Sequence, residues 1–230
     1  MSKGTATQKR KCSVCGKSES RTAEGAVQRF AGENRYTTAA IVSSKTFEKA
    51  DTVVIAFGEN YPDALSVNPT AAIKNAPIIY LNDKGTINKT SKAYLESVKG
   101  SVKKAYVIVG EGVVPDDMLK QAGDVLGVAP IRLGGQDRYE TCTAVHETFK
   151  DLFTGNMICI ATGDDFIDAL IGGVYAAINR SPLFLAAGGL NDAQKAYLRA
   201  KAPDKLCIFG GEGAVPDELL EKIAKECVSG

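Results

Sequence analysis

Short apolar runs rich in Val and Ile alternate with longer amphipathic stretches along most of the chain. The apolar runs lie at 53–57, 77–81 and 105–109, and again at 157–161, 182–186 and 206–209. Their length and composition predict strands. The amphipathic stretches between them, such as 62–75 and 88–99, predict helices. Nearly continuous apolar strands separated by helices are typical of a parallel sheet covered on both faces, so the pattern predicts an α/β fold.

Four sequence blocks occur twice in the same order. RFAGENRYTTA at 29–39 returns as RLGGQDRYETC at 132–142, and GENYPDAL at 58–65 returns as GDDFIDAL at 163–170. APIIYL at 76–81 returns as SPLFLA at 181–186, and VGEGVVPD at 109–116 returns as GGEGAVPD at 210–217. The copies are separated by 101 to 105 residues throughout. The chain therefore contains two copies of one α/β unit.

The repeat predicts two folded units, at 27–127 and 128–230, each an open three-layer α/β domain. Residues 1–26 are rich in Lys, Ser, Thr and Gly and are expected to form a flexible tail. The chain begins MSKGT without an apolar stretch, so no signal peptide is visible. No apolar run approaches the ~18 residues of a membrane span, and we expect no membrane insertion.

Charge is nearly balanced over the whole chain but unevenly distributed. There are 28 Lys and Arg against 27 Asp and Glu, and 44% of the residues are hydrophobic, as in a globular protein. Residues 1–26 hold a net charge of +4 and the remainder −3. A folded part with a small acidic excess lacks the basic footprint of a DNA-binding domain, so we expect no nucleic acid partner. An anionic polymer would need a local basic patch.

The cysteines do not define a metal site. Cys12 and Cys15 have the spacing of half a zinc knuckle, but a structural zinc site needs four ligands and the only histidine is His146. Cys142 and His146 lie four residues apart and would share one helix face, a spacing that suits a metal pair or an activated thiol. The first unit lacks both residues at the equivalent positions, so we expect no metal.

An Arg-Tyr pair recurs at the expected start of the first long helix of each unit, and an aspartate recurs at the start of the second helix. These residues are Arg35, Tyr36 and Asp63 in the first unit and Arg138, Tyr139 and Asp168 in the second. All follow the carboxyl ends of strands, where open α/β sheets bind ligands. Each arginine either pairs with the aspartate or, with the tyrosine, contacts an anionic or hydroxyl-rich ligand. For the aspartates the structural pairing is favoured.

No catalytic or cofactor motif is recognisable. GEGVVP at 110–115 begins like the G-x-G-x-x-G dinucleotide fingerprint, but Pro115 replaces the third glycine, and the turn follows the last strand of the unit instead of the first. H-E-x-x-H, G-x-S-x-G and P-loop motifs are absent, and one histidine offers little for acid–base chemistry. We therefore expect no cofactor and no enzymatic activity.

The motifs AGENRYTTA, GENYPDALS, APIIYL and VIVGEGVVP resemble the clostridial cell-wall-binding repeat 2 family, and the resemblance covers both units from 27 to 227. It implies a Rossmann-like, flavodoxin-type module that occurs in tandem on surface proteins of Gram-positive bacteria. It also implies an extracellular, non-catalytic role in anchoring to an anionic polysaccharide of the cell wall. The family's R-Y-x-T-A pattern falls on the two Arg-Tyr pairs, with Cys142 in place of the last alanine of the second copy.

The chain departs from the family in the number of modules. The resemblance implies three tandem modules that pack as a pseudo-threefold trimer with ligand at the junctions, whereas this chain has two. A third module outside this chain, or self-association, would complete the junctions. CSVCGK at 12–17 resembles the end of a short Cys-containing repeat of large surface proteins, which favours a piece of a longer extracellular polypeptide.

Two other classes of function stay open at the level of sequence. An enzyme could act on a nucleotide or sugar at the strand carboxyl ends with the repeated Arg, Tyr and Asp. A structural spacer would use the same motifs only for packing. Because catalytic residues are scarce, the sequence favours a cell-surface binding module.

Overall fold

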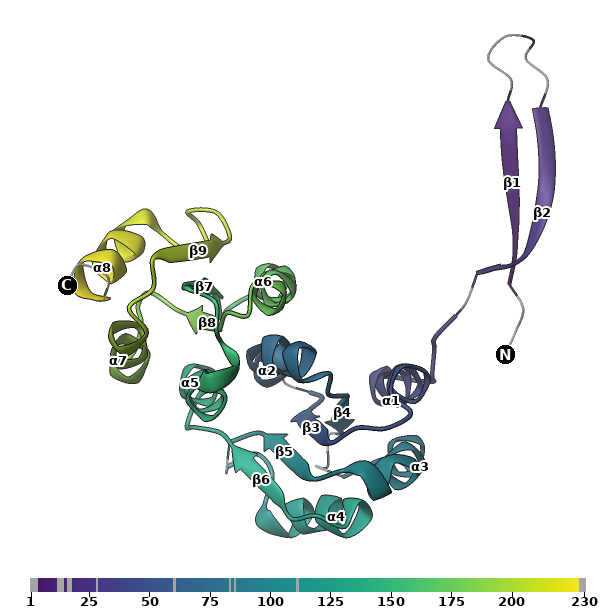
Figure 1. Cartoon of the computed structure of the whole chain (residues 1–230), viewed down its shortest axis with the longest axis horizontal. Helices are drawn as coiled ribbons and strands as arrows, with labels where there is room; N and C mark the ends of the chain where they lie inside the picture. Colours follow the sequence, from purple (N-terminus) through teal and green to yellow (C-terminus); the bar gives the residue numbers. More distant parts are fainter. Residues whose placement is uncertain are drawn as a thin grey trace.

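The computed structural model describes residues 4–11, 15, 18–27, 29–59, 61–82, 84, 86–110 and 112–227. Strands β1 (Gly4–Lys11) and β2 (Ser18–Val27) pair antiparallel and form a hairpin that stands apart from the remaining helices and sheets (Figure 1). Mobility of the predicted tail stays a prediction. Cys12, half of the predicted Cys-x-x-Cys remnant, lies outside the described residues.

Beyond the hairpin, helices and strands alternate as the hydrophobic pattern predicts. The first repeat forms α1 (Arg35–Thr46), β3 (Thr52–Phe57), α2 (Tyr61–Lys74), β4 (Ile78–Leu81), α3 (Lys89–Val98), η1 (Lys99–Ser101), β5 (Lys104–Ile108) and α4 (Asp116–Leu126). The second forms β6 (Pro130–Leu133), α5 (Arg138–Thr148), η2 (Lys150–Leu152), β7 (Met157–Thr162), α6 (Ile167–Ile178), β8 (Leu183–Ala186), α7 (Asp192–Lys201), β9 (Lys205–Phe209) and α8 (Asp217–Cys227). Each strand expected from an apolar run is confirmed within one residue at either end.

The strands form two all-parallel sheets, which confirms the predicted tandem α/β fold. The first sheet has the order β4-β3-β5-β6 and the second the order β8-β7-β9. Strand β6 follows the predicted boundary between residues 127 and 128, yet it pairs with β5, with Arg132 opposite Val107. A strand from the second repeat therefore completes the sheet of the first.

Alternate residues of the first sheet point into two different cores. Val53 and Ile55 are fully buried in a cluster with side chains of α1, α3 and α4. Val54 is buried on the opposite face, with side chains of α2 and α5. Since both faces are covered, nearly every position in β3 must be apolar, and this explains its uninterrupted hydrophobic run.

The second of these cores joins the two repeats. It contains Val67 of α2 and Tyr106 of β5 from the first repeat, and Val145 and Phe149 of the second. The rings of Tyr106 and Phe149 meet edge to face with centroids 4.7 Å apart. Helix α2 also packs against α6 (Figure 1), so α2 is enclosed by α5, α6 and its own sheet.

The second sheet is covered less completely than the first. Helices α5, α7 and α8 pack on one face, where Cys142, Leu198 and Ile223 are buried, and α6 packs on the other. The outward side of α6 is apolar and exposed; it comprises Ile167, Leu170, Ile171, Val174 and Ile178. No helix within the described ranges is long and apolar enough to cross a membrane.

Candidate ligand site at the junction of the two units

Side-chain caps place the two Arg-Tyr pairs at helix starts. The Asn34 side chain accepts a hydrogen bond of 3.0 Å from the backbone N–H of Thr37. Asp137 similarly accepts bonds of 2.8 Å from the N–H groups of Tyr139 and Glu140. Because an N-cap residue immediately precedes the first helical residue, Arg35 and Arg138 become the first residues of α1 and α5, as predicted.

Each arginine is held by the carbonyl group that follows a strand. Nη1 of Arg35 donates to the carbonyl of Gly58 at 3.1 Å, directly after β3. Nη1 of Arg138 donates to the carbonyl of Gly163, directly after β7. The two guanidinium groups therefore lie at the carboxyl ends of the two sheets, the edge at which open α/β sheets bind ligands.

The same glycines make room for the tyrosine rings. A Cβ atom at Gly58 would overlap the ring of Tyr36, and a Cβ atom at Gly163 would overlap the ring of Tyr139. Both glycines are needed for close approach, since neither has a positive φ. Arg, Tyr and Gly consequently form one packed group at the carboxyl end of the central strand in each unit.

In the second unit this group faces aromatic and acidic residues of both repeats. The hydroxyl of Tyr61, from α2, donates to the carbonyl of Asp164 at 3.3 Å, and its ring lies 5.4 Å from that of Phe166. The hydroxyl of Tyr139 donates to Oδ1 of Asp164 at 3.4 Å. Sequence reasoning did not select Tyr61, Asp164 or Phe166. The recurrence of an aromatic residue at equivalent positions 61 and 166 was the available signal.

Asp63 faces the arginine of the other repeat. Its side chain lies in the junction, with the residue 5% exposed, and burial raises its pKa to about 6 while the charge of Arg138 lowers it. Within the described ranges, neither Asp63 nor Asp168 lies within 4.0 Å of a basic side-chain nitrogen. Pairing of the aspartates with arginine therefore stays a prediction, and the arginine that acts on Asp63 is Arg138 and not Arg35.

The arginine of the equivalent group in the first unit is more exposed to solvent. The Arg35 side chain is 63% exposed, and its Nη1 lies 4.0 Å from Oε2 of Glu59. Arg138 is half-buried instead, while Tyr36 and Tyr139 are half-buried alike, so the two groups differ in the exposure of the arginine. Of the two equivalent groups, one is thus built into a junction and the other is not.

The predicted Cys142–His146 pair belongs to the core. Nε2 of His146 lies 2.6 Å from the carbonyl of Leu183, and the Cys142 thiol donates to the same oxygen at 3.3 Å. The His146 ring is enclosed by Phe153 and Phe184. Burial lowers the pKa of His146 to about 4 and raises that of Cys142 to about 12, so the pair is a neutral packing element. No cluster of three metal-ligating side chains occurs in the part of the chain described.

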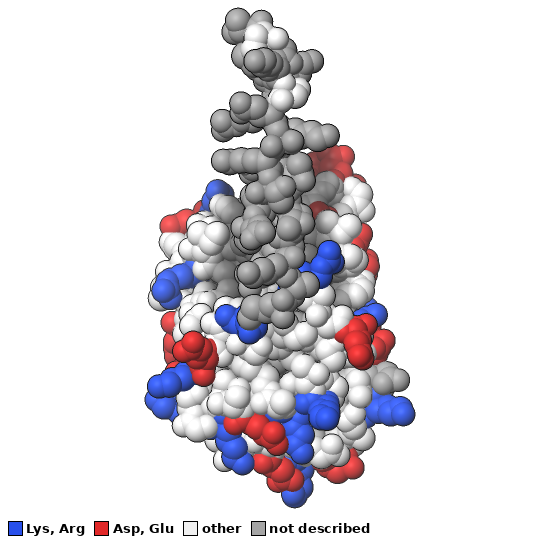
Figure 2. All heavy atoms as spheres, turned by 90° about the vertical axis from the view of Figure 1, so that its right-hand side faces the viewer, with Lys and Arg blue, Asp and Glu red and all other residues white. Residues whose placement is uncertain are grey.

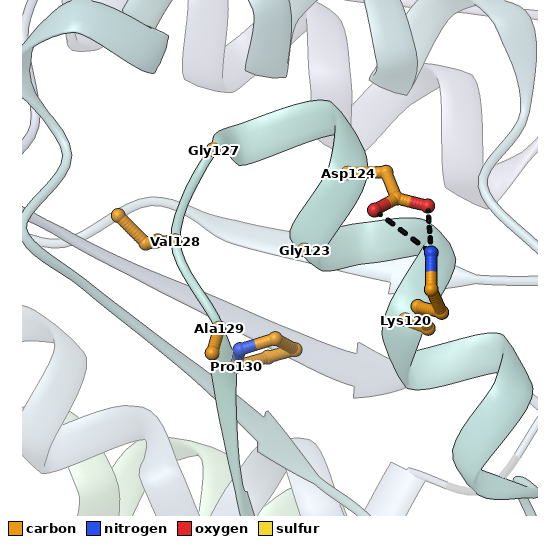
Figure 3. A pocket seen from close by; sticks show the side chains of 7 residues that line it. All are labelled: Lys120, Gly123, Asp124, Gly127, Val128, Ala129 and Pro130. Atoms are coloured by element: carbon orange, nitrogen blue, oxygen red, sulfur yellow. Dashed lines mark hydrogen bonds and ion pairs between the residues drawn. The ribbon is translucent and has the colours of Figure 1, made fainter.

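A separate cleft of about 470 Å³ lies where α4 turns into β6 (Figure 3). Gly123 and 127–130 line it together with Lys120 and Asp124, which form an ion pair of 2.9 Å on its rim. It opens at the amino end of β6, away from the arginines at the carboxyl ends of the strands. Apart from this solvent-exposed ion pair, its lining consists of glycines and small apolar side chains, so it offers little to bind a specific ligand.

Comparison with known families decides what the repeated unit is. The model of cell wall binding domain 2 (CWB2) matches residues 29–119 and 132–220. The chain belongs to the CWB2 family. Both matched regions are binding domains, and domains of this kind imply a location at the cell surface or in the cell wall.

Longer proteins carry similar CWB2 regions. The chain is 30% identical over 202 residues to the N-acetylmuramoyl-L-alanine amidase LytC of Bacillus subtilis, covering 87% of this chain and 39% of that protein. It is 28% identical over 200 residues to the amidase enhancer of the same organism, covering 86% of this chain and 26% of the relative. The chain thus spans less than half the length of these relatives.

Two solved structures share the arrangement of the tandem CWB2 domains. Cwp6 from Clostridium difficile matches with a TM-score of 0.81 and 24% identity, over 96% of this chain and 35% of that one. Cwp8 from the same organism matches with a TM-score of 0.75 and 29% identity, over 86% of this chain and 33% of that one. The likeness extends across both domains and the junction between them.

Proposed function

We propose that the chain anchors a larger extracellular protein, without catalysis, to an anionic polysaccharide of the cell wall. The contact would be made by the Arg-Tyr pairs Arg35–Tyr36 and Arg138–Tyr139. The observation that carries the proposal is their shared position at the carboxyl ends of two parallel sheets, held by Gly58 and Gly163. Membership of a cell-wall-binding family supports the same role.

The chemistry of this group suits a charged sugar polymer. A guanidinium presents several N–H donors in a planar fork that matches carboxylate and phosphate oxygens. A tyrosine ring beside it gives a flat apolar face for a sugar and a hydroxyl that can hydrogen-bond. Polar groups of both repeats meet at Tyr139 and Asp164, so one polymer segment could contact both units.

Attraction to the polymer must be local. On the face shown in Figure 2, basic and acidic side chains are interspersed, and neither sign forms a continuous field. Over the whole chain basic and acidic residues number 28 and 27. Because exposed charge–charge contacts are screened by salt, binding should weaken as the ionic strength rises.

Co-sedimentation with purified cell walls tests the anchoring role. We expect the protein to sediment with walls that carry their anionic polymer and to stay in solution with walls from which it has been removed. Equal sedimentation with both preparations would show that the anionic polymer is not the ligand.

Variants of Arg35 separate ligand contact from structural support. Arg35→Ala removes a side chain that is 63% exposed, so the melting temperature should stay close to that of the parent while wall binding falls. Lys103→Ala is the matched control. It removes one exposed positive charge at the amino end of β5, whereas Arg35 lies at the carboxyl ends of the strands. An Arg35→Ala protein that binds as well as Lys103→Ala would exclude this arginine from the polymer site.

A further inference from the structure

Two cysteines of the second sheet lie side by side on adjacent strands. Cys159 of β7 is the register partner of Cys207 of β9, and both are thiols in this structure. Register partners in a parallel pair of strands project from the same face of the sheet. Neighbouring strands lie about 4.8 Å apart, within the Cα separation of about 4.4–6.8 Å that a disulfide spans. The backbone therefore already holds these two residues at the spacing of a disulfide.

The Cys207 thiol points towards β7. Its Sγ donates to Sδ of Met157 at 3.7 Å, and Met157 lies two residues before Cys159 on the same face of that strand. The two thiols also act on each other. Burial raises the pKa of the Cys159 thiol to about 12, and the adjacent Cys207 thiol contributes to the rise. Both sulfur atoms therefore lie over the same two strands.

The pair combines an accessible thiol with an enclosed one. Cys159 is fully buried. Cys207 is half-buried and belongs to β9, the outermost strand of its sheet within the described residues. In the first repeat the equivalent register partners are Val54 and Tyr106, so the cysteine pair is a feature of the second unit alone.

We propose that Cys159 and Cys207 are a disulfide site that fixes the edge strand β9 to β7 in the folded chain. Domains of this family imply a location at the cell surface or in the cell wall, outside the reducing cytosol in which thiols persist. The bond holds β9 to the strand that ends before Gly163, whose carbonyl group holds Arg138.

A small disulfide such as oxidised glutathione is the oxidant. The Cys207 thiolate attacks one of its sulfur atoms, forms a mixed disulfide and releases the first small thiol. Cys159 then loses its proton, and its sulfur attacks Sγ of Cys207, which forms the bond between the two cysteines and releases the second small thiol. Two protein thiols are thereby oxidised, and the small disulfide is reduced to two thiols that carry the two protons. Because the pKa of Cys159 is raised, the second step should be the slower one.

Oxidation of the folded full chain by oxidised glutathione tests the proposal. Remaining thiols are blocked with N-ethylmaleimide before the protein is unfolded and digested with trypsin without reduction. We expect the peptides 151–180 and 206–222 to be linked, and dithiothreitol to separate them. The oxidised chain should melt several degrees above the reduced chain, because the bond closes a loop that contains α6, β8 and α7.

Variants that copy the first repeat provide the matched comparison. Cys159→Val introduces the residue of the equivalent position 54 and should abolish both the linked peptides and the rise in melting temperature. Cys142→Ala introduces the residue of the equivalent position 39 at another buried cysteine, and should leave both results unchanged.

Four results would overturn the proposal. They are a parent chain in which both thiols remain unmodified, glutathione that stays attached to Cys207, a linkage confined to other cysteines such as Cys12 and Cys15, and a linked chain that melts no higher than the reduced one. The assays contain no wall material, so their outcome is independent of polymer binding.

Discussion

Asp63 illustrates how a junction between repeats changes the chemistry of a single residue. Its counterpart Asp168 is half-buried, but Asp63 is enclosed because α2 is covered by the second repeat. Burial raises the pKa of Asp63 from 3.8 to about 6, against the opposing effect of Arg138. A carboxyl group with a raised pKa in the folded state stabilises the fold when protonated, and this contribution is lost as the pH rises towards 6.

We predict that Asp63→Asn raises the free energy of unfolding above pH 6, because it removes a buried charge that is costly there. The gain is at most about 3 kcal/mol, the equivalent of a two-unit pKa difference. Urea unfolding at a series of pH values measures it. Asp168→Asn removes one negative charge at the equivalent position and is the control; an Asp63→Asn protein that is no more stable than the parent at neutral pH would contradict the prediction.

His146 affects the pH dependence of stability in the opposite direction to Asp63. Its pKa falls from 6.5 to about 4 on folding because the imidazole is buried, so the unfolded chain binds a proton at a higher pH than the folded chain. The stability that the neutral ring contributes is therefore present above pH 6.5 and is lost as the pH falls towards 4.

We predict that His146→Gln removes this loss, because glutamine can still donate to the carbonyl of Leu183 but does not titrate. The parent should lose up to about 3 kcal/mol more than the variant between pH 6.5 and pH 4. Unfolding curves of both proteins across this range provide the comparison. Parallel pH profiles would mean that His146 titrates alike in the folded and unfolded chain.

At the scale of elements, α2 and α6 show the same sequence position in two environments. Ser66 of α2 is fully buried, and the equivalent Ile171 of α6 is 61% exposed. Leu65 and Leu170 show the same contrast, at 6% and 47%. Helix α2 is covered by α5 and α6, while α6 has no counterpart of α5 on its outward side among the described residues.

We predict opposite outcomes for a lysine at these two positions. Ile171→Lys should change the free energy of unfolding by no more than about 0.5 kcal/mol, because the position is open to solvent. Ser66→Lys should cost several kcal/mol or prevent folding, since it forces a charge into the packed junction. Chemical denaturation of the two variants compares them directly. Similar losses in both would show that the exposed side of α6 is covered in solution.

Most elements could be predicted from the sequence, and the exceptions have a common cause. The apolar runs of β3 and β7 are long enough to show that both faces are buried. Strand β6 gives no such signal, because only Ile131 and Leu133 of its four residues belong to an apolar pattern, and Pro130 and Arg132 interrupt it. It is a strand only because the edge of β5 and the acceptors around Gly110 are present to receive it.

The candidate site was predictable only in part for a similar reason. The repeat and the N-cap residues place Arg35 and Arg138 at helix starts beside strand ends. That Arg138 faces Asp63 depends on how α5 packs against α2, and a repeat pattern contains no information about contacts between the repeats. Tyr61 and Phe166 likewise become neighbours only in the assembled junction.

At the scale of the whole molecule, shared packing joins the two units into one structural body. The core around Val67 and Phe149 takes side chains from both repeats, and β6 links the first sheet to α5. We therefore predict a single cooperative thermal transition for residues 29–227. Differential scanning calorimetry should give equal calorimetric and van't Hoff enthalpies. Two resolved transitions would show that the junction contributes little to the stability of either unit.

Strand β6 belongs to the second sequence repeat but completes the first sheet. The boundary of the first folded unit therefore lies several residues after the boundary of the sequence repeat. A chimera joined at residue 127 would give the first sheet a foreign fourth strand. A chimera joined just after Leu133 would keep all four native strands and would move the seam into the loop before α5. Gene duplication therefore yields a complete new sheet only when the following copy supplies the arginine-bearing strand.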